Sequence, residues 1–463
     1  MFTKKKSWKK FQLVRISYKF EKEKAMKKYA IGLDFGTSSI KGMLLSENEE
    51  VIAKGSVSTV YGENSHPDGA KYISLDAEEL YLNMCRLIRE LRSKLPEDGK
   101  ITAMTFACAS GNTLLCDKDG QPLLPAYSWL NPAYTDECTA VYGYIDKEEA
   151  RALSGWGFSG TFPLGHLAHI KIHNPELFGS AGFVCMTGEY INHRLTGKWG
   201  LDTSTAVPFF LAEMQTRRYH KPYLDALGIT EDMLPPLMKT GDVLGKVTKA
   251  AAKETGLDAG TEIRLGSFDH PAGARGNGVL KEGQLMVSCG TSWVCFFPCA
   301  DRQLLLDQKA LVDPFYSADG GLYAGLVSVG QAAIFVDKLV TKYISDADDR
   351  HIAYDRASEA AKPGADGLRI HPSLDYDKDF SAYSKENIAR AVMEGTVYDL
   401  KAKLQPLEDA GLKFDSIVMA GGPSNSRIWR QITEEIMGIP VTVKYGAYSG
   451  AAGAAKVALG LIK

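Results

Sequence analysis

The chain has 463 residues, of which 45% are hydrophobic and 24% are charged, and its formal net charge is −2. This length exceeds what one hydrophobic core usually spans, so we expect a two-domain globular protein, while the near-neutral charge and the lack of an apolar run of 18 residues argue against nucleic-acid and membrane partners. The eight cysteines are scattered without a CxxC motif, which favours reduced thiols in a cytoplasmic protein.

The N-terminal stretch differs from the rest of the chain. Residues 1–25 are rich in lysine, and Arg15 interrupts their one apolar segment, so they are not predicted to be a signal peptide. Met26 directly precedes KKYAIGLDFG, which has the character of a natural chain start. We expect residues 1–26 to be a basic extension, either a disordered tail or sequence upstream of the true start.

Strand-like and helix-like segments then alternate, which predicts an α/β fold. Three apolar segments in succession predict two consecutive hairpins and a partly antiparallel sheet: KKYAIGLDF (27–35), IKGMLL (40–45) and EEVIAKGSV (49–57). Asp76 begins a helix, with Glu79 three residues later as in a capping box, and apolar residues from Leu80 to Leu91 form its buried face. ITAMTFACA (101–109) is the next predicted strand, and residues 165–235 are expected to be rich in loops and helices.

The pattern restarts near residue 262, where EIRLGSF is predicted to be a strand. QLMVSCGTSWVCFF (284–297) then repeats the strand, Gly-Thr-Ser turn and strand of the chain start. We therefore predict a duplicated domain, with units at residues 27–272 and 273–463 and a ligand cleft between them. SIVMAGGPSNSRIWRQITEEIM (416–437) is predicted as strand, Gly-Gly turn and helix, and SGAAGAAKVALGLI (449–462) as a helix of small residues.

The two Gly-Thr-Ser turns are candidate phosphate-binding loops. The sequence contains neither GxxxxGK[ST] nor a GxGxxG after a strand, which excludes a P-loop and gives no support to a dinucleotide-binding fold. Backbone N–H groups in a tight turn converge on an anion, and neighbouring hydroxyls add donors. Asp34, at the tip of the first strand, is placed to hold Mg²⁺ through water.

Asp269 is the candidate general base, because it follows an apolar strand in GSFDHPAGARGNGVL (266–280). A sugar hydroxyl that attacks a γ-phosphate must lose its proton, and a carboxylate within hydrogen-bond reach can accept it. The alternative interpretation is that Asp269 caps the helix that follows.

Several motifs in order resemble the FGGY carbohydrate kinase family of the actin-like ATPase superfamily, over roughly residues 28–462. The segments that carry the resemblance are IGLDFGTSSIK, LLCDKDGQPLLPAYSWLN, YINHRLTGKWGLDTSTA, GSFDHPAGARGNG, VSCGTSW, MAGGPSNSRIWRQITEEIMGIPV and SGAAGAA. The resemblance implies two ribonuclease-H-like domains with Mg²⁺ and ATP in the cleft. It also implies phosphoryl transfer to a polyol or a sugar, such as a pentulose or hexulose.

The resemblance also implies roles for individual residues. The first phosphate loop and its metal-side acid correspond to Asp34, Gly36, Thr37 and Ser38, with Lys41 beside them. Asp269 corresponds to the catalytic base and His270 to a substrate contact. The second phosphate loop and the adenosine pocket correspond to Gly290, Thr291, Ser292, Gly330, Gly421, Gly422, Asn425 and Ser426.

Two segments depart from the family pattern on the sugar side. ACASGNT (107–113) places Ser110, Gly111 and Asn112 in the sugar-contacting loop, without the acid, histidine or arginine that many relatives carry there. The usual Trp-x-Asp-x-Arg is replaced by Trp129, Leu130, Asn131, Pro132 and Ala133. The substrate assignment stays open. Two alternative functions also stay open, a filament- or chaperone-type ATPase and a non-catalytic sensor of sugar and ATP. Whether the chains pair into a homodimer is open as well.

Three further features are open to a functional and a structural interpretation. His166, His169 and His173 fall on one helical face and could bind zinc, although no acidic or cysteine ligand is near them in the sequence. Trp156 could stack on a sugar or simply pack in a loop. Asp202 and Ser204 are interpreted as structural residues.

Overall fold

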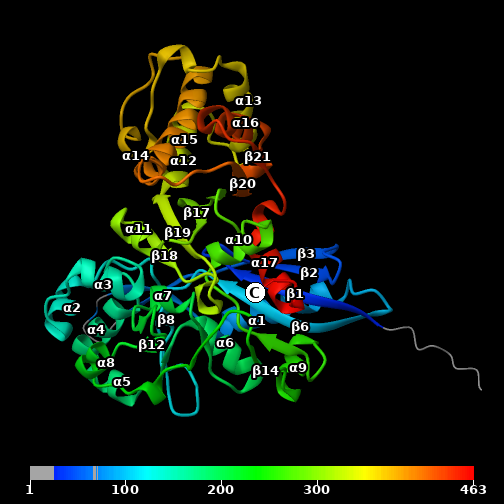
Figure 1. Cartoon of the computed structure of the whole chain (residues 1–463), viewed down its shortest axis with the longest axis vertical. Helices are drawn as coiled ribbons and strands as arrows, with labels where there is room; N and C mark the ends of the chain where they lie inside the picture. The colour runs from blue at the N-terminus through cyan, green and yellow to red at the C-terminus, as the bar shows by residue number, and fades with distance from the viewer. Residues whose placement is uncertain (1–25, 66–68, 70, 463) are drawn as a thin grey trace, which may run out of the picture.

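The computed structural model describes residues 26–65, 69 and 71–462. They form two lobes, which Figure 1 shows one above the other, with the first half of the chain in the lower lobe and most of the second half in the upper lobe. The predicted N-terminal extension lies outside the described residues, except for the exposed Met26. All eight cysteines lie in the described part as buried free thiols. In the same residues, no helix combines the length and the apolarity that crossing a bilayer requires.

The lower lobe is built on a six-stranded sheet of order β14-β15-β6-β1-β2-β3. Its strands are β1 (Lys27–Phe35), β2 (Ser39–Ser46), β3 (Val51–Ser58), β6 (Gly99–Cys108), β14 (Val243–Lys246) and β15 (Glu262–Arg264). The two predicted hairpins are confirmed, because β1 pairs antiparallel with β2 and β2 with β3, while β1 pairs parallel with β6. The strand predicted from residue 262 is shorter than expected, since pairing ends at Arg264 and the chain turns toward the cleft.

The upper lobe repeats this arrangement in a sheet of order β18-β19-β17-β16-β20-β21. Its strands are β16 (Gln284–Cys289), β17 (Trp293–Cys299), β18 (Leu311–Asp313), β19 (Tyr323–Val329), β20 (Ser416–Gly421) and β21 (Val441–Thr442). Three strands are again antiparallel neighbours, and the first of them, β16, again pairs parallel with a later strand, β20. The shared topology confirms the predicted duplication.

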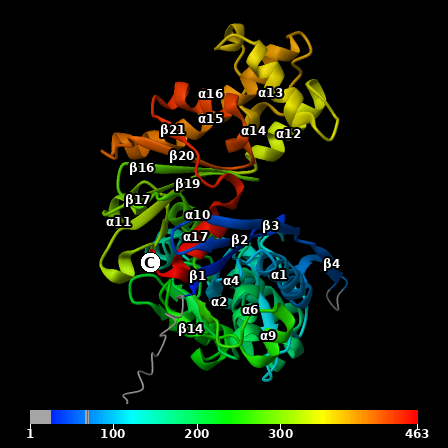
Figure 2. The same cartoon turned by 90° about the vertical axis from the view of Figure 1, so that its right-hand side faces the viewer.

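Helices and short strands complete both lobes, as Figures 1 and 2 show. The lower lobe carries α2 (Thr135–Tyr142), α3 (Lys147–Ser154), α4 (Pro163–His173), α5 (Pro175–Ser180), α7 (Ala206–Phe209) and α8 (Lys221–Leu227), which confirms a helix-rich segment. Short strands accompany them: β4 (Gly62–Ser65), β5 (Lys71–Leu75), β7 (Leu114–Cys116), β8 (Ala126–Tyr127), β9 (Phe183–Cys185), β10 (Leu201–Asp202), β11 (Ala212–Glu213), β12 (Arg218–Tyr219) and β13 (Leu237–Met238). The upper lobe carries α11 (Arg302–Asp307), α12 (Ala332–Tyr343), α13 (Arg350–Ala360), α14 (Pro372–Asp375), α15 (Lys385–Asp409) and α16 (Arg427–Met437).

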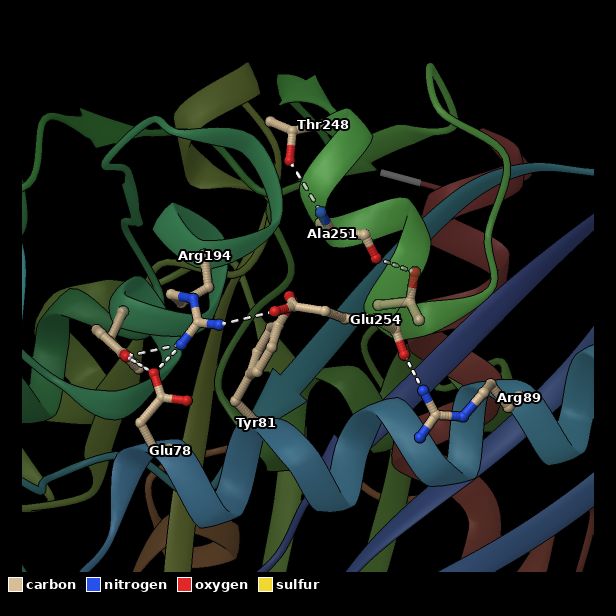
Figure 3. Close-up of polar contacts among 9 residues, drawn as sticks. Glu78, Tyr81, Arg89, Arg194, Thr248, Ala251 and Glu254 are labelled. Carbon is tan, nitrogen blue, oxygen red and sulfur yellow. Dashed lines mark hydrogen bonds and ion pairs between the residues drawn. The ribbon is translucent and has the colours of Figure 1, made fainter.

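Helix α1 (Ala77–Arg92) begins where the sequence predicts, because the Asp76 carboxylate accepts hydrogen bonds from the N–H groups of Glu78 and Glu79. A polar cluster joins α1 to α6 (Thr187–Thr196) and α9 (Lys249–Thr255). Arg194 forms ion pairs with Glu78 and Glu254, and the Tyr81 hydroxyl donates to Glu254 at 2.6 Å (Figure 3). Three helices from distant parts of the chain are thereby fixed to one another beneath the sheet.

Two helices of small residues lie between the lobes, α10 (Asp269–Asn277) and α17 (Ser449–Leu459), as both views show. They cross so closely that a Cβ at Gly453 would lie 1.8 Å from the carbonyl oxygen of Ala272, and one at Gly276 would lie 2.2 Å from that of Ser449. Helix α17 also packs on β1, where a Cβ at Gly32 would meet the Ala451 carbonyl at 2.1 Å. The last helix of the chain therefore covers the first strand, which explains the run of glycine and alanine in both helices.

Candidate active site

A cleft of about 350 Å³ lies where the two lobes meet, and residues of both lobes line it. Most of the residues singled out in the sequence come together on its wall: Asp34, Gly36, Thr37, Ser38, Lys41, Asp269, His270, Gly290, Thr291, Ser292 and Gly421. They arrive from the ends of β1 and β16, from the start of α10 and from the end of β20. Most of the site residues predicted from the two halves of the sequence therefore lie in a single cleft.

Two matching three-residue loops form part of the cleft wall. Residues 36–38 join β1 to β2 and residues 290–292 join β16 to β17. Each loop is closed by a backbone hydrogen bond from its glycine, at 3.1 Å from Gly36 N to Ser39 O and at 3.2 Å from Gly290 N to Ser292 O. Both turns bring residues with small hydroxyl side chains to the same cleft, an arrangement that suits an anion.

Asp34 is the first acid of the site. Its position opposite Lys41 is set by the β1–β2 register, and its side chain is half-buried on the wall of the cleft. Burial and, to a smaller extent, the charge of Asp269 raise the pKa of Asp34 to about 7, although Lys41 acts to lower it. Among the described residues, Oδ1 of Asp34 has no hydrogen-bond partner. A buried carboxylate oxygen without a partner, next to a second acid, fits a divalent cation that accepts oxygen ligands.

Asp269 is the first residue of α10 and its side chain is 26% exposed to the cleft. The alternative of a helix cap does not describe it, because the cap position belongs to Phe268 and no side chain caps this helix. Its Oδ1 accepts a hydrogen bond from the N–H of the adjacent His270 at 2.7 Å. The carboxylate therefore faces the cleft at the end of a buried segment, where it can accept a proton from a bound hydroxyl.

Aromatic side chains form the wall beside Asp269. Trp129, Trp156, Phe162 and Phe268 line the cleft there, and the Trp156 ring lies edge-on to Phe162 and to Phe268 at 5.8 and 5.5 Å. Ser110 Oγ and Trp156 Nε1 are buried polar atoms without a partner in the described part of the chain. No sequence pattern predicted that Phe162 and Phe268 would line the site, since isolated phenylalanines resemble ordinary core residues.

Other predicted residues lie next to the cleft without lining it. Asn112 is buried, and its Oδ1 accepts from the N–H of Thr187 at 2.8 Å, while Gly111 has a φ of +94° and packs against Phe162. The member of this loop that lines the cleft is Ser110. Asn131 also lies off the wall, because its amide brackets the backbone of Ile73 through two hydrogen bonds of 2.7 and 2.8 Å.

The predicted adenosine residues lie at the edge of the upper lobe. Gly330 follows β19, and the N–H of the next residue donates to the Ser292 hydroxyl at 3.2 Å. Gly422 and Asn425 form a short 3-10 turn, and Ser426 caps α16 by accepting from the N–H of Trp429. A cavity of about 320 Å³ opens beside this turn, lined by Pro423, Tyr354, Trp429 and Trp293 among others.

The back of the site is tied across the lobes by a buried hydrogen-bond chain. Ser204 donates from its hydroxyl to Asp313 Oδ2 at 2.6 Å and accepts from the N–H of Phe268 at 3.2 Å. Asp202 accepts from the N–H of Thr205. These contacts agree with the structural interpretation of Asp202 and Ser204, and they connect β18 of the upper lobe to the residue before Asp269.

The repeated sheets and the cleft between them define a two-domain protein of the actin-like ATPase architecture. The family model for the N-terminal domain of the FGGY family of carbohydrate kinases matches residues 29–276, and the model for its C-terminal domain matches residues 285–460. The chain therefore belongs to the FGGY family of carbohydrate kinases, whose members are phosphotransferases with an alcohol group as acceptor.

Named relatives agree with this family. A xylulose kinase of Bacillus subtilis is 26% identical over 454 residues, which cover 93% of this chain and 88% of the relative. An autoinducer-2 kinase of Yersinia enterocolitica is 27% identical over 478 residues, covering 94% and 87%. The crystal structure of a xylulose kinase from Rhodospirillum rubrum superposes with a TM-score of 0.80 at 25% identity, over 93% of this chain and 90% of that one.

Proposed function

We propose that this protein transfers the γ-phosphate of ATP to a hydroxyl of a small, uncharged sugar or polyol, such as a pentulose or hexulose. The observation that carries the proposal is the convergence of two Gly-Thr-Ser loops and two aspartates, Asp34 and Asp269, on one cleft with an aromatic wall. Membership of a carbohydrate kinase family supports the reaction class. The cleft geometry supports the assignment of roles within it.

The phosphate chain of ATP is proposed to lie between the loops at residues 36–38 and 290–292, with Lys41 near the first loop. Adenosine would lie along the Gly421–Gly422 turn toward the cavity beside Pro423, where Gly422 has no neighbouring atom within 4 Å of a Cβ position. Gly330, Asn425 and Ser426 are proposed to contact the nucleotide as well. Mg²⁺ would be held on the side of Asp34, where it would neutralise charge on the phosphates.

Asp269 is proposed to act as the general base. Its carboxylate accepts the proton of the acceptor hydroxyl while the hydroxyl oxygen forms a bond to the γ-phosphorus. The bond between that phosphorus and the β–γ bridging oxygen breaks, and ADP leaves with the electron pair. His270, which also lines the cleft, would contact the acceptor. Closure of the two lobes on the bound substrates would exclude water and limit hydrolysis of ATP.

The acceptor side favours a neutral ligand. Apart from Asp269, the wall formed by Ser110, Trp129, Trp156 and Phe162 carries no acid and no arginine. An aromatic wall can stack on the C–H face of a sugar, and the few polar groups select hydroxyls by hydrogen bonding. The names of the relatives include xylulose and autoinducer-2 as acceptors, and they support a sugar-type acceptor for this chain without choosing between the two.

ADP release by the purified protein with Mg²⁺ and ATP, measured against a panel of ketoses, aldoses and polyols, tests the proposal. We expect one strong acceptor, and a loss of roughly two to four orders of magnitude in kcat for Asp269→Asn with ATP binding retained. Wild-type-like turnover by that variant would overturn the role of Asp269. Acceptor-independent ATP hydrolysis, or tight binding of ATP with no turnover across the panel, would overturn the proposed reaction.

A further inference from the structure

Outside the cleft, three metal-ligating side chains converge where α2 packs on α4, two helices that lie side by side in Figures 1 and 2. His169 and His173 are four residues apart near the end of α4, so both rings project from one face of the helix. Glu137 reaches the same point from α2. Its Oε1 lies 2.8 Å from Nδ1 of His169 and 3.5 Å from Nε2 of His173.

Helix packing supplies an acidic ligand that lies far from the two histidines in the sequence. Helix α4 itself contains no acidic residue, but α2 brings Glu137 to the two histidines. The ligand atoms of Glu137, His169 and His173 all lie within 4.8 Å of one another. His166, the third histidine of the sequence pattern, does not belong to this group, because its Nδ1 bonds to the Thr113 hydroxyl at 2.9 Å. Burial lowers the pKa of His166 to about 3, so this ring is a neutral core residue.

We propose that Glu137, His169 and His173 form a binding site for one divalent transition-metal ion, with Zn²⁺ as the best-fitting ion. Two imidazoles and one carboxylate are a common zinc ligand set, which leaves a fourth position for water. Metal–ligand bonds of about 2.0–2.2 Å in a tetrahedron place ligand atoms about 3.3 Å apart, close to the separations present between Glu137 and the two rings. Mg²⁺ and Ca²⁺ prefer sites of oxygen ligands alone, so they fit poorly.

The surroundings of the site favour binding from solvent. The side chains of His173 and Glu137 are 35% and 20% exposed, whereas His169 is 9% exposed and stacked on the Tyr134 ring at 4.0 Å. One ligand is therefore fixed in place, and the other two can adjust around an incoming ion.

A bound ion would brace α2 against α4. Phe162 directly precedes α4, and Trp129 lies a few residues before α2, so both helices are continuous with the aromatic wall of the cleft. An ion that binds the folded chain and not the unfolded chain stabilises it, by an amount that grows with the ratio of ion concentration to Kd. The site is separate from the Asp34 side of the cleft and needs no nucleotide.

Calorimetry and Co²⁺ absorption on tag-free, chelator-treated protein without nucleotide test the site, with Zn²⁺ and Co²⁺ as probes. We expect one equivalent to bind, with the visible absorption of four-coordinate Co²⁺ and a rise in Tm. Glu137→Gln and His173→Ala should each weaken binding at least about tenfold and remove the Tm rise. His220→Ala is the matched control, since His220 pairs with Glu213 at 3.0 Å without a third ligand in the described residues.

The two variants keep the result interpretable. His173 is partly exposed at the end of a helix, and Glu137→Gln preserves the shape and a hydrogen-bond acceptor, so circular dichroism should show a native fold for at least one of them. Loss of metal binding in a folded variant, with the His220→Ala control unaffected, would support the proposal. Wild-type protein without saturable binding, or variants that bind as tightly as wild type, would overturn it.

Discussion

Gly450, near the start of the last helix, lies directly against the carboxylate of Asp34 at the end of the first strand. A Cβ at position 450 would lie 2.5 Å from Oδ2 of Asp34. Both residues line the cleft. The proposed metal-side acid is thus held from one side by β1 and from the other by α17, so its position depends on the contact between the two ends of the described chain.

We predict that Gly450→Ala impairs catalysis by displacing this acid. A real Cβ does not approach an oxygen at 2.5 Å, so Asp34 or α17 must shift. We expect kcat/KM for ATP to fall at least about tenfold, which equals about 1.4 kcal/mol of lost transition-state stabilisation. Gly179→Ala is the matched control, because a Cβ at Gly179 has no atom within 4 Å. Steady-state kinetics on both variants would reject the prediction if Gly450→Ala behaved like the control.

The raised pKa of Asp34 predicts a pH dependence of stability in the absence of metal and nucleotide. The pKa of this carboxyl is about 7, against an ordinary value of 3.8, so between these values the folded chain holds a proton that the unfolded chain has released. The contribution of Asp34 to stability is therefore fully present below about pH 4, and it is lost as the pH rises through 7. At about 1.4 kcal/mol per pKa unit, the loss is on the order of 4 kcal/mol.

Comparison of wild type with Asp34→Asn isolates this effect from that of other acids. Asp202 and Glu189 have pKa values raised by burial to about 6 and 8, so they contribute slopes of the same sign in both proteins. We expect urea unfolding at a series of pH values to show that Asp34→Asn gains stability relative to wild type as the pH rises from 4 to 8. The prediction is wrong if the difference between the two proteins is constant with pH. The exposed Asp232→Asn serves as control.

The Ser204 hydrogen-bond chain predicts a combined effect on stability and turnover. Ser204→Ala leaves a buried oxygen of Asp313 without its 2.6 Å donor and the Phe268 N–H without its acceptor. An unsatisfied buried polar group costs about 1–3 kcal/mol, so Tm should fall. Because Phe268 directly precedes Asp269, kcat should fall with little change in KM for ATP. Ser180→Ala, which removes an exposed hydroxyl bonded to a helix carbonyl, should change neither quantity.

Features with a local cause could be predicted from the sequence. The β1–β2 hairpin, the Asp76 cap and the Gly-Thr-Ser turns depend on residues that are close to one another in the sequence. The repeat of the hairpin motif in the second half of the chain predicted the duplicated domain and the position of the cleft between its two units. The position of Asp269 after an apolar strand indicated its role as general base, and the family resemblance implied the same role.

Features that arise from packing between distant segments could not be predicted in this way. Glu137 joins His169 and His173 only because α2 lies on α4, and Ser204 meets Asp313 only because the lobes come together. The altered acceptor motif shows the same limit. Asn131 occupies the position where the family pattern has an acid, yet its side-chain amide forms two hydrogen bonds with the backbone of Ile73.

The two unpartnered polar atoms of the aromatic wall give the sharpest prediction about the acceptor. In the described residues, neither Ser110 Oγ nor Trp156 Nε1 has a hydrogen-bond partner, and both residues line the cleft. Trp156→Phe removes this unpartnered donor and keeps an aromatic ring beside Phe162 and Phe268. The same change should raise KM for the acceptor about tenfold, since a hydrogen bond to a substrate hydroxyl is lost, with KM for ATP unchanged.

Ser110→Ala should have the same effect on the two KM values. The control is Trp199→Phe, which should leave both KM values unchanged because the Trp199 indole stacks on His193 away from the cleft. Equal acceptor KM values across all three variants would show that these atoms do not contact the substrate.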